Sequence, residues 1–198
     1  MIEKNKDQRP EMAWKVMDIT DMSEFATDSF DLAIDKSTID ALLCGDDYLL
    51  KVALMLKESQ RVLKPGGHYF AISYGKPESR VSHFIRGFLS WDRREFILYE
   101  GDIETEEEKE EKSHWIYVNQ VRDDANEISE KYFDTEFKNL QVENEYQKLL
   151  EMELENEKLE QEQIEEVKET REEFKARIKG CLSSRGSKNQ LSEERKEE

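Results

Sequence analysis

The chain has 198 residues, enough for one domain and an appendage, and with 39% charged and only 36% hydrophobic residues it is too polar to be globular throughout. Its formal net charge of −17 argues against DNA or RNA as a direct partner, because an acidic surface repels phosphates. The same charge favours a basic protein as substrate or partner.

The first half of the chain alternates apolar runs with helical patterns. Ala13–Met17 has the pattern of a short strand that ends at Asp18, and Phe30–Ile34 that of a second strand, which ends at Asp35. Apolar residues three and four positions apart then predict a helix over Tyr48–Leu63. Ligands of open α/β sheets bind at the carboxyl ends of strands, so Asp35 marks a candidate site.

Proline and glycine at Lys64-Pro65-Gly66-Gly67 predict the end of this helix. The elements expected next are a buried strand at His68–Ser73, a helix at Val81–Leu89, and strands at Glu95–Glu100 and His114–Gln120 joined by the acidic loop Gly101–Lys112. The alternation predicts an α/β fold in which Phe30–Asp35 and the three later strands form one sheet, with an antiparallel pair at one edge.

The composition changes near Asp123, and a long acidic helix is predicted over 126–179. Its apolar residues keep rough three- and four-residue spacing without a strict heptad, so a solvated charged helix, a helix packed on a partner and a disordered segment all stay open. The predicted division is a partial domain at 1–122, an acidic helix or coiled-coil arm at 123–182, and a polar flexible tail at 183–198.

We expect the helix to serve as an interaction arm that binds a protein partner and projects from the domain instead of folding back over the sheet. Its apolar stripe is too thin for a core and its charge too dense for burial. A helix of this length would reach roughly 80 Å at about 1.5 Å per residue. Such reach suits an elongated assembly, for example a coiled-coil partner or a cytoskeletal lattice.

No pattern typical of a metal site, a disulfide framework or a membrane segment is found. Cys44 and Cys181 lie far apart, and the three histidines lack metal-ligand spacing. The charged start MIEKNKDQRP predicts no signal peptide, and no apolar run approaches the length of a membrane span. The expected protein is therefore intracellular and cytoplasmic, with reduced thiols and no bound metal.

Three segments, WKVMDITDM, SFDLAIDKSTIDALLCGDD and MLKESQRVLKPGGHYFAISYGKP, together resemble class I S-adenosylmethionine-dependent methyltransferases (methyltransferase type 11). The similarity is greatest to the branch with the endothelin-converting-enzyme-2-like enzymes and the lysine methyltransferases of elongation factor 1-alpha. It covers roughly 3–120. It implies a Rossmann-like sheet, S-adenosylmethionine as cofactor and a protein substrate.

The resemblance also implies roles for individual residues. Asp18 would accept a hydrogen bond from the adenine amino group, and the backbone of Ile19 would lie beside the adenine ring. Asp35 and Lys36 would lie near the methionine moiety and the transferred methyl group, as the catalytic pair. Each aspartate has a structural alternative, because Asp18 can be a polar strand end or a helix cap, and Asp35 can cap a helix that begins near Thr38.

The chain lacks two parts that the resemblance implies, namely the first strand with its glycine-rich loop and the acidic residue that ends the second strand. The earliest glycine is Gly45, so the chain is expected to start inside the family domain. Losing two hydrogen bonds from a buried carboxylate removes about 3–6 kcal/mol, which turns a micromolar site into a millimolar one or worse. Without its two neighbours, Trp14–Met17 must pair with Phe30–Ile34, pair with another chain, or stay unpaired.

Three explanations compete for such a sequence. It is an incomplete product of a real enzyme, an inactive pseudoenzyme scaffold that binds through its helix, or one half of a site that a second polypeptide completes. The expectation is that this chain alone methylates nothing, and that Asp35 and Lys36 persist as structural residues. Whether the chain is an enzyme is left open by the sequence.

Overall fold

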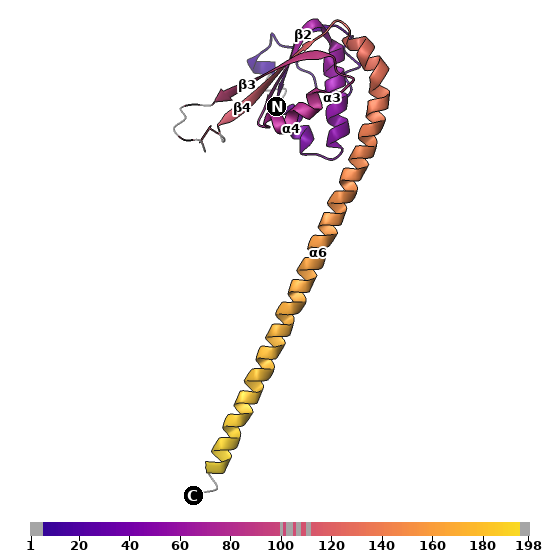
Figure 1. The fold of residues 1–198 in the computed structure, drawn as a ribbon. Helices are drawn as coiled ribbons and strands as arrows, with labels where there is room; N and C mark the ends of the chain where they lie inside the picture. The colour runs from indigo at the N-terminus through magenta and orange to yellow at the C-terminus, as the bar shows by residue number, and fades with distance from the viewer. Residues whose placement is uncertain (1–5, 100, 102–104, 106–107, 110–111, 195–198) are drawn as a thin grey trace. The chain divides into compact units, whose positions relative to one another are not determined.

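The computed structural model describes residues 6–99, 101, 105, 108–109 and 112–194 (Figure 1). The chain divides into two compact units, Met1–Glu145 and Tyr146–Glu198. Within the described residues no helix is both long and apolar enough to cross a membrane.

The first unit contains a four-stranded mixed sheet with the order β1-β2-β4-β3. Its strands are β1 at Phe30–Lys36, β2 at Leu63–Ser73, β3 at Trp91–Tyr99 and β4 at Ser113–Val121. Strand β1 pairs with β2 in parallel, whereas β4 pairs antiparallel with both β2 and β3. The predicted α/β class, the single sheet and the antiparallel pair at one edge are confirmed; Glu100 lies outside the described residues.

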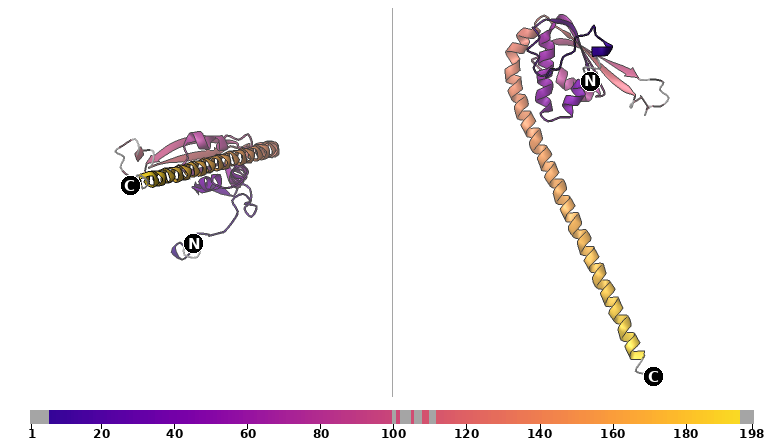
Figure 2. Two further views of the ribbon diagram at one scale, coloured as in Figure 1. Left: turned by 90° about the horizontal axis from the view of Figure 1, so that it is seen from below. Right: turned by 180° about the vertical axis from the view of Figure 1, so that it is seen from behind.

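Three helices, α2 at Thr38–Leu43, α3 at Tyr48–Val62 and α4 at Pro77–Phe84, lie on one side of the sheet (Figure 2). They bury every second side chain of the strands, and the main core forms between these layers. Members of this core from α2, α3, the strands and α4 are Ile39, Val52, Met55, Leu56, Tyr69, Ala71, Phe84 and Tyr117.

Two of the predicted elements are corrected. Ala13–Met17 is not a strand: it is irregular, and Val16 is 81% exposed. A strand needs a hydrogen-bonding neighbour, and within the described residues none lies beside this segment, so it stays unpaired. The helix expected at Val81–Leu89 begins and ends earlier, because Pro77 provides a favourable first residue.

The predicted helix end at Lys64-Pro65-Gly66-Gly67 is confirmed, but these residues lie within β2 instead of before it. The pairing with β1 jumps from Phe30–Leu63 to Leu32–His68, so the segment forms an irregularity in the strand. Gly66 has φ of 80°, a conformation that glycine adopts without strain.

The predicted acidic helix is present as α6 at Ala125–Glu194. It starts close to the expected residue but continues past the expected end at 179, so the backbone of 183–194 is helical where a flexible tail was predicted. Its first part belongs to the first unit, where Phe133 and Leu140 are buried with Leu49 of α3. The boundary between compact units therefore falls within the helix, after Glu145, and not at 122. The roles assigned to the three predicted regions stay predictions.

The second unit consists of the remainder of α6. Among its described residues, the glutamates and several apolar side chains are exposed to solvent. Such a helix has no core of its own, which agrees with the thin apolar stripe seen in the sequence.

Candidate functional site at the strand ends

The carboxyl end of β1 is fixed by Asp35, which is buried. Its Oδ1 accepts a hydrogen bond from the backbone N–H of Thr38 at 2.7 Å, and its Oδ2 accepts one from the N–H of Ile39 at 3.1 Å. The Tyr69 hydroxyl donates a third bond to Oδ2 at 2.8 Å. The carboxylate thus satisfies two free N–H groups at the start of α2 and joins that helix to β2.

Burial raises the pKa of Tyr69 well above its ordinary value, and the neighbouring Asp35 carboxylate raises it further. Tyr69 therefore stays protonated and keeps donating to Asp35 through the physiological range. Helix capping, which was one of the two interpretations of Asp35 from the sequence, describes what the side chain does in this structure. The buried hydrogen bond from Tyr69 was not foreseen.

A second polar network lies beside the first, at the ends of β1 and β2. Asp40 on α2 accepts hydrogen bonds from the Ser73 hydroxyl, from the Tyr74 N–H at 3.2 Å and from Arg80, whose Nη2 lies 2.9 Å from Oδ1. The side chains of Asp40 and Arg80 are each 16% exposed. Sequence reasoning missed this pair because its members are distant in the chain. The available signal was an acid in the first turn of α2.

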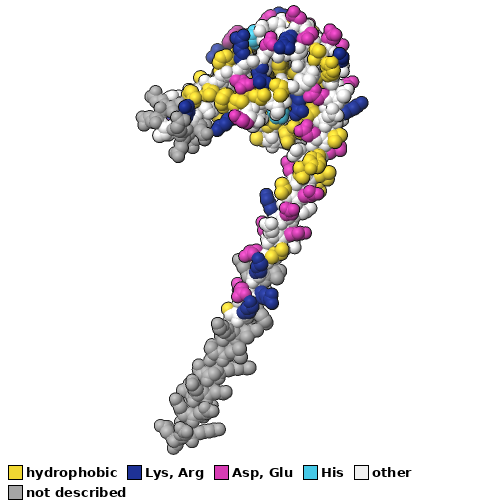
Figure 3. All heavy atoms as spheres, viewed as in Figure 1, with side chains coloured by type: hydrophobic (Ala, Val, Ile, Leu, Met, Phe, Trp, Pro, Cys, Tyr) yellow, Lys and Arg dark blue, Asp and Glu magenta, His cyan; other side chains and the backbone are white. Residues whose placement is uncertain are grey.

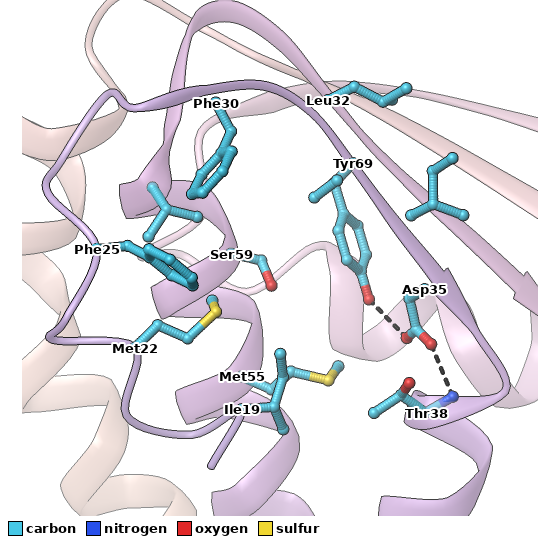
Figure 4. Close-up of a pocket in the computed structure, with 13 residues that line it drawn as sticks. Ile19, Met22, Phe25, Phe30, Leu32, Asp35, Thr38, Met55, Ser59 and Tyr69 are labelled. Atoms are coloured by element: carbon cyan, nitrogen blue, oxygen red, sulfur yellow. Dashed lines mark hydrogen bonds between the residues drawn. The ribbon is translucent and has the colours of Figure 1, made fainter. Parts of the chain in front are cut away.

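An apolar cavity of about 310 Å³ lies next to Asp35, between β1, α3 and the segment before β1 (Figure 4). Side chains from both faces of β1 line it. The polar side chains in its wall are those of Asp35, Thr38, Ser59 and Tyr69; the apolar lining is Ile19, Met22, Phe25, Phe30, Leu32, Ala33, Ile34, Met55 and Val62.

The structure brings together only part of the predicted site. Ile19 and Asp35 line the same cavity, whereas Asp18 and Lys36 do not. Asp18 is exposed, and its Oδ1 accepts hydrogen bonds from the backbone N–H and hydroxyl of Thr20. The bond from the backbone N–H of Thr20 has the larger effect, and together the two bonds lower the pKa of Asp18. Lys36 is exposed on the end of β1.

The residues around the cavity fit S-adenosylmethionine only in part. The apolar wall suits a flat ring, and the volume is at the lower end of the ~300–1,000 Å³ of ligand pockets. The ribose hydroxyls and the charged methionyl group need polar partners, but Asp35 is occupied by its three hydrogen bonds. The described residues therefore do not provide a complete site for this cofactor. They also contain no cluster of three or more metal-ligating side chains.

Substituting Tyr69 with phenylalanine is expected to lower the free energy of unfolding by about 1.5–3 kcal/mol, the usual contribution of a hydrogen bond to a charged group. Urea denaturation followed by circular dichroism measures this loss. Tyr74→Phe is the matched control on an exposed tyrosine, where a change within about 0.5 kcal/mol is expected. Equal losses in both variants would contradict the importance of the Tyr69–Asp35 bond.

Comparison with known proteins gives consistent results for this part of the chain. Residues 1–71 match the family described as "Methyltransferase domain". The chain is 41% identical over 91 residues to the eEF1A lysine and N-terminal methyltransferase of Bos taurus, a match with 43% of this chain and 13% of that protein. It is 29% identical over 100 residues to EEF1A lysine methyltransferase 4 of Mus musculus, with 46% of this chain and 39% of that protein covered.

The chain thus spans well under half the length of these relatives. A SAM-dependent methyltransferase from Methanosarcina mazei overlaps with 55% of this chain and 66% of its own, at 14% identity and a TM-score of 0.36. The resemblance to S-adenosylmethionine-dependent methyltransferases of the elongation factor 1-alpha lysine branch, inferred from the motifs, is confirmed by the sequence matches.

Proposed function

We propose that this chain forms part of a cytoplasmic protein-lysine methyltransferase that uses S-adenosylmethionine, and that the 198-residue chain alone binds this cofactor weakly and transfers no methyl group. The observation that supports the second half of the proposal is that Asp35 already accepts three hydrogen bonds, from Thr38, Ile39 and Tyr69. A carboxylate held in this way orders the strand end but has little capacity left for a ligand.

The roles proposed for the chain's own residues follow from where they lie. Ile19 supplies part of an apolar wall suited to the adenine ring, and Asp18 precedes it at the surface. Asp35 positions the start of α2, and the exposed Lys36 lies next to it at the strand end, where the methyl acceptor would approach. The proposed acceptor is a lysine of a protein, because the relatives are named for lysine methylation of eEF1A.

We predict that the chain binds S-adenosylmethionine with a dissociation constant well above 10 μM, which corresponds to about −7 kcal/mol. Isothermal titration of the full chain measures this constant. Asp18→Ala is expected to leave the weak binding unchanged, since this carboxylate contacts Thr20 at an exposed position. Binding tighter than 10 μM that is lost on Asp18→Ala would refute the weak-binding proposal and establish Asp18 as an adenine ligand.

The alternative is a pseudoenzyme scaffold or structural subunit, for instance of a cytoskeletal assembly, that binds a protein through α6. The exposed apolar side chains of the second unit favour this reading. The two functions differ in a direct assay. Methylation of recombinant eEF1A by the chain, supplied with S-adenosylmethionine, would support the enzyme, and partner binding without methylation would support the scaffold.

A further inference from the structure

One face of the sheet is open to solvent. Helices cover the face that carries Tyr69, Ala71 and Tyr117, and alternation places the next residue of each strand on the other face. There Ile34 is 67% exposed and Phe96 is 52% exposed. The apolar members of this open face are Leu32, Ile34, Phe70, Ile72, Phe96, Leu98, Ile116 and Val118. Figure 3 shows hydrophobic side chains gathered over β3 and β4.

The charges on the open face are mainly positive. Lys36 aligns with Ile72, and Arg94 aligns with Val118, so both lie on this face at opposite edges of the sheet. The acid on the same face, Asp92, forms an ion pair with Arg122. Among the described residues, Lys36 and Arg94 form no ion pair within 4 Å, and they lie on either side of an apolar centre.

The second unit carries exposed apolar residues that are accompanied mainly by negative charges, in contrast to the open face. Tyr146, Leu149, Leu150 and Leu154 are three, four and eight residues apart, which places them along one side of the helix. Leu149 is 59% exposed. Five glutamates and two lysines accompany them between 146 and 160, namely Glu151, Glu153, Glu155, Glu157, Glu160, Lys148 and Lys158. We call the four apolar residues the arm stripe.

Three pairings of two copies would bury these exposed apolar surfaces, and the charges discriminate among them. Two open faces would bring Lys36 and Arg94 of each copy against those of the other. Two arm stripes would bring glutamates against glutamates. Only an arm stripe on an open face pairs acidic flanks with basic edges while covering a sheet with an amphipathic helix, which is a common layer arrangement.

We propose that the arm stripe of one copy docks on the open face of the sheet in a second copy. The contact would bury apolar side chains that monomeric proteins rarely leave exposed together. The contact needs no cofactor. Because Leu32 and Ile34 of the open face also line the cavity, Phe96→Glu, which lies outside the cavity lining, separates the test from the proposed methyltransferase function.

Sedimentation velocity of the full chain over about 1–100 μM is expected to show association that increases with concentration. The association is expected to weaken as salt rises, because the Debye length falls to about 3 Å at 1 M salt. Ile34→Glu on the face and Leu149→Lys on the stripe are each expected to raise the dissociation constant at least about tenfold. Leu159→Lys is the matched control, because this exposed leucine lies on the opposite side of the helix. Phe96→Glu, on the opposite edge strand of the same face, repeats the test if Ile34→Glu perturbs folding.

Mixing the face variant with the stripe variant provides the decisive measurement. Each defective copy still carries one intact surface, so a mixture of Ile34→Glu and Leu149→Lys is expected to associate although neither variant does so alone. The proposal is overturned by a monomer at all concentrations. It is also overturned if only stripe substitutions matter, as in an arm-to-arm coiled coil, or if only face substitutions matter, as in sheet-to-sheet packing.

Discussion

Asp35→Ala is expected to lower the free energy of unfolding by about 3–5 kcal/mol, the largest effect of any substitution at the candidate site. The alanine removes an acceptor from the N–H groups of Thr38 and Ile39 and from the buried Tyr69 hydroxyl. Each donor left without a partner in a buried place costs about 1–3 kcal/mol, and part of the total is the loss of a helix cap. Urea denaturation at neutral pH measures the change.

Asp31→Ala is the matched control on the same strand. The Asp31 side chain is 82% exposed and pairs with Lys64 at 2.7 Å, so its removal is expected to cost no more than about 1 kcal/mol. A similar small loss for Asp35→Ala would contradict the structural role of Asp35. It would return the carboxylate to the set of groups available for cofactor or substrate.

The parts of the fold that were predictable from the sequence depend on local signals. The apolar spacing of Tyr48–Leu63 and the glycine pair after it specify α3 and its end within a short window. Strand β1 was predictable because its apolar run stops at a charged residue. The alternation of strands and helices also predicted that the strands share one sheet with an antiparallel pair at one edge.

The failures involve information that is not local. Ala13–Met17 has a strand-like composition, but a strand forms only with a neighbour, and sequence pattern does not reveal whether one is present. The ion pair of Asp40 and Arg80 joins α2 to α4 across the end of β2, a contact created by the tertiary fold. At the candidate site, Asp35 was identified, but Tyr69 was visible only as a buried strand residue.

The first turns of α6 illustrate the same limit. The whole helix was predicted to be too charged for burial, yet Phe133 and Leu140 are buried against α3 and Phe88, with the rings of Phe88 and Phe133 5.0 Å apart. The charge averaged over the whole helix conceals a short segment that has an apolar side of its own. Since Phe133 and Leu140 lie within the first unit, that segment is part of the domain core, and the remainder of the helix is the arm.

The buried His83 makes the stability of the first unit depend on pH. Burial, together with the charges of the nearby Arg86 and Arg80, lowers the pKa of His83 to about 4. His83 lines a second pocket together with Arg80, Arg86, Glu136 and Glu143. The two glutamates favour the protonated imidazole, but burial and the two arginines outweigh them. The imidazole is therefore neutral in the folded chain at pH values where it is already protonated in the unfolded chain.

We expect this difference to destabilise the fold on acidification. Between pH 6.5 and about 4 the unfolded state binds a proton that the folded state does not, so stability falls as pH decreases, by up to about 3 kcal/mol from this residue. His83→Gln removes the titrating group and is expected to flatten the stability profile over that window, measured by urea denaturation at half-unit pH steps. His114→Gln, at a half-buried histidine beside Tyr74, is the matched substitution against which the flattening is judged. An unchanged slope in His83→Gln would show that carboxylates, and not this histidine, control acid unfolding.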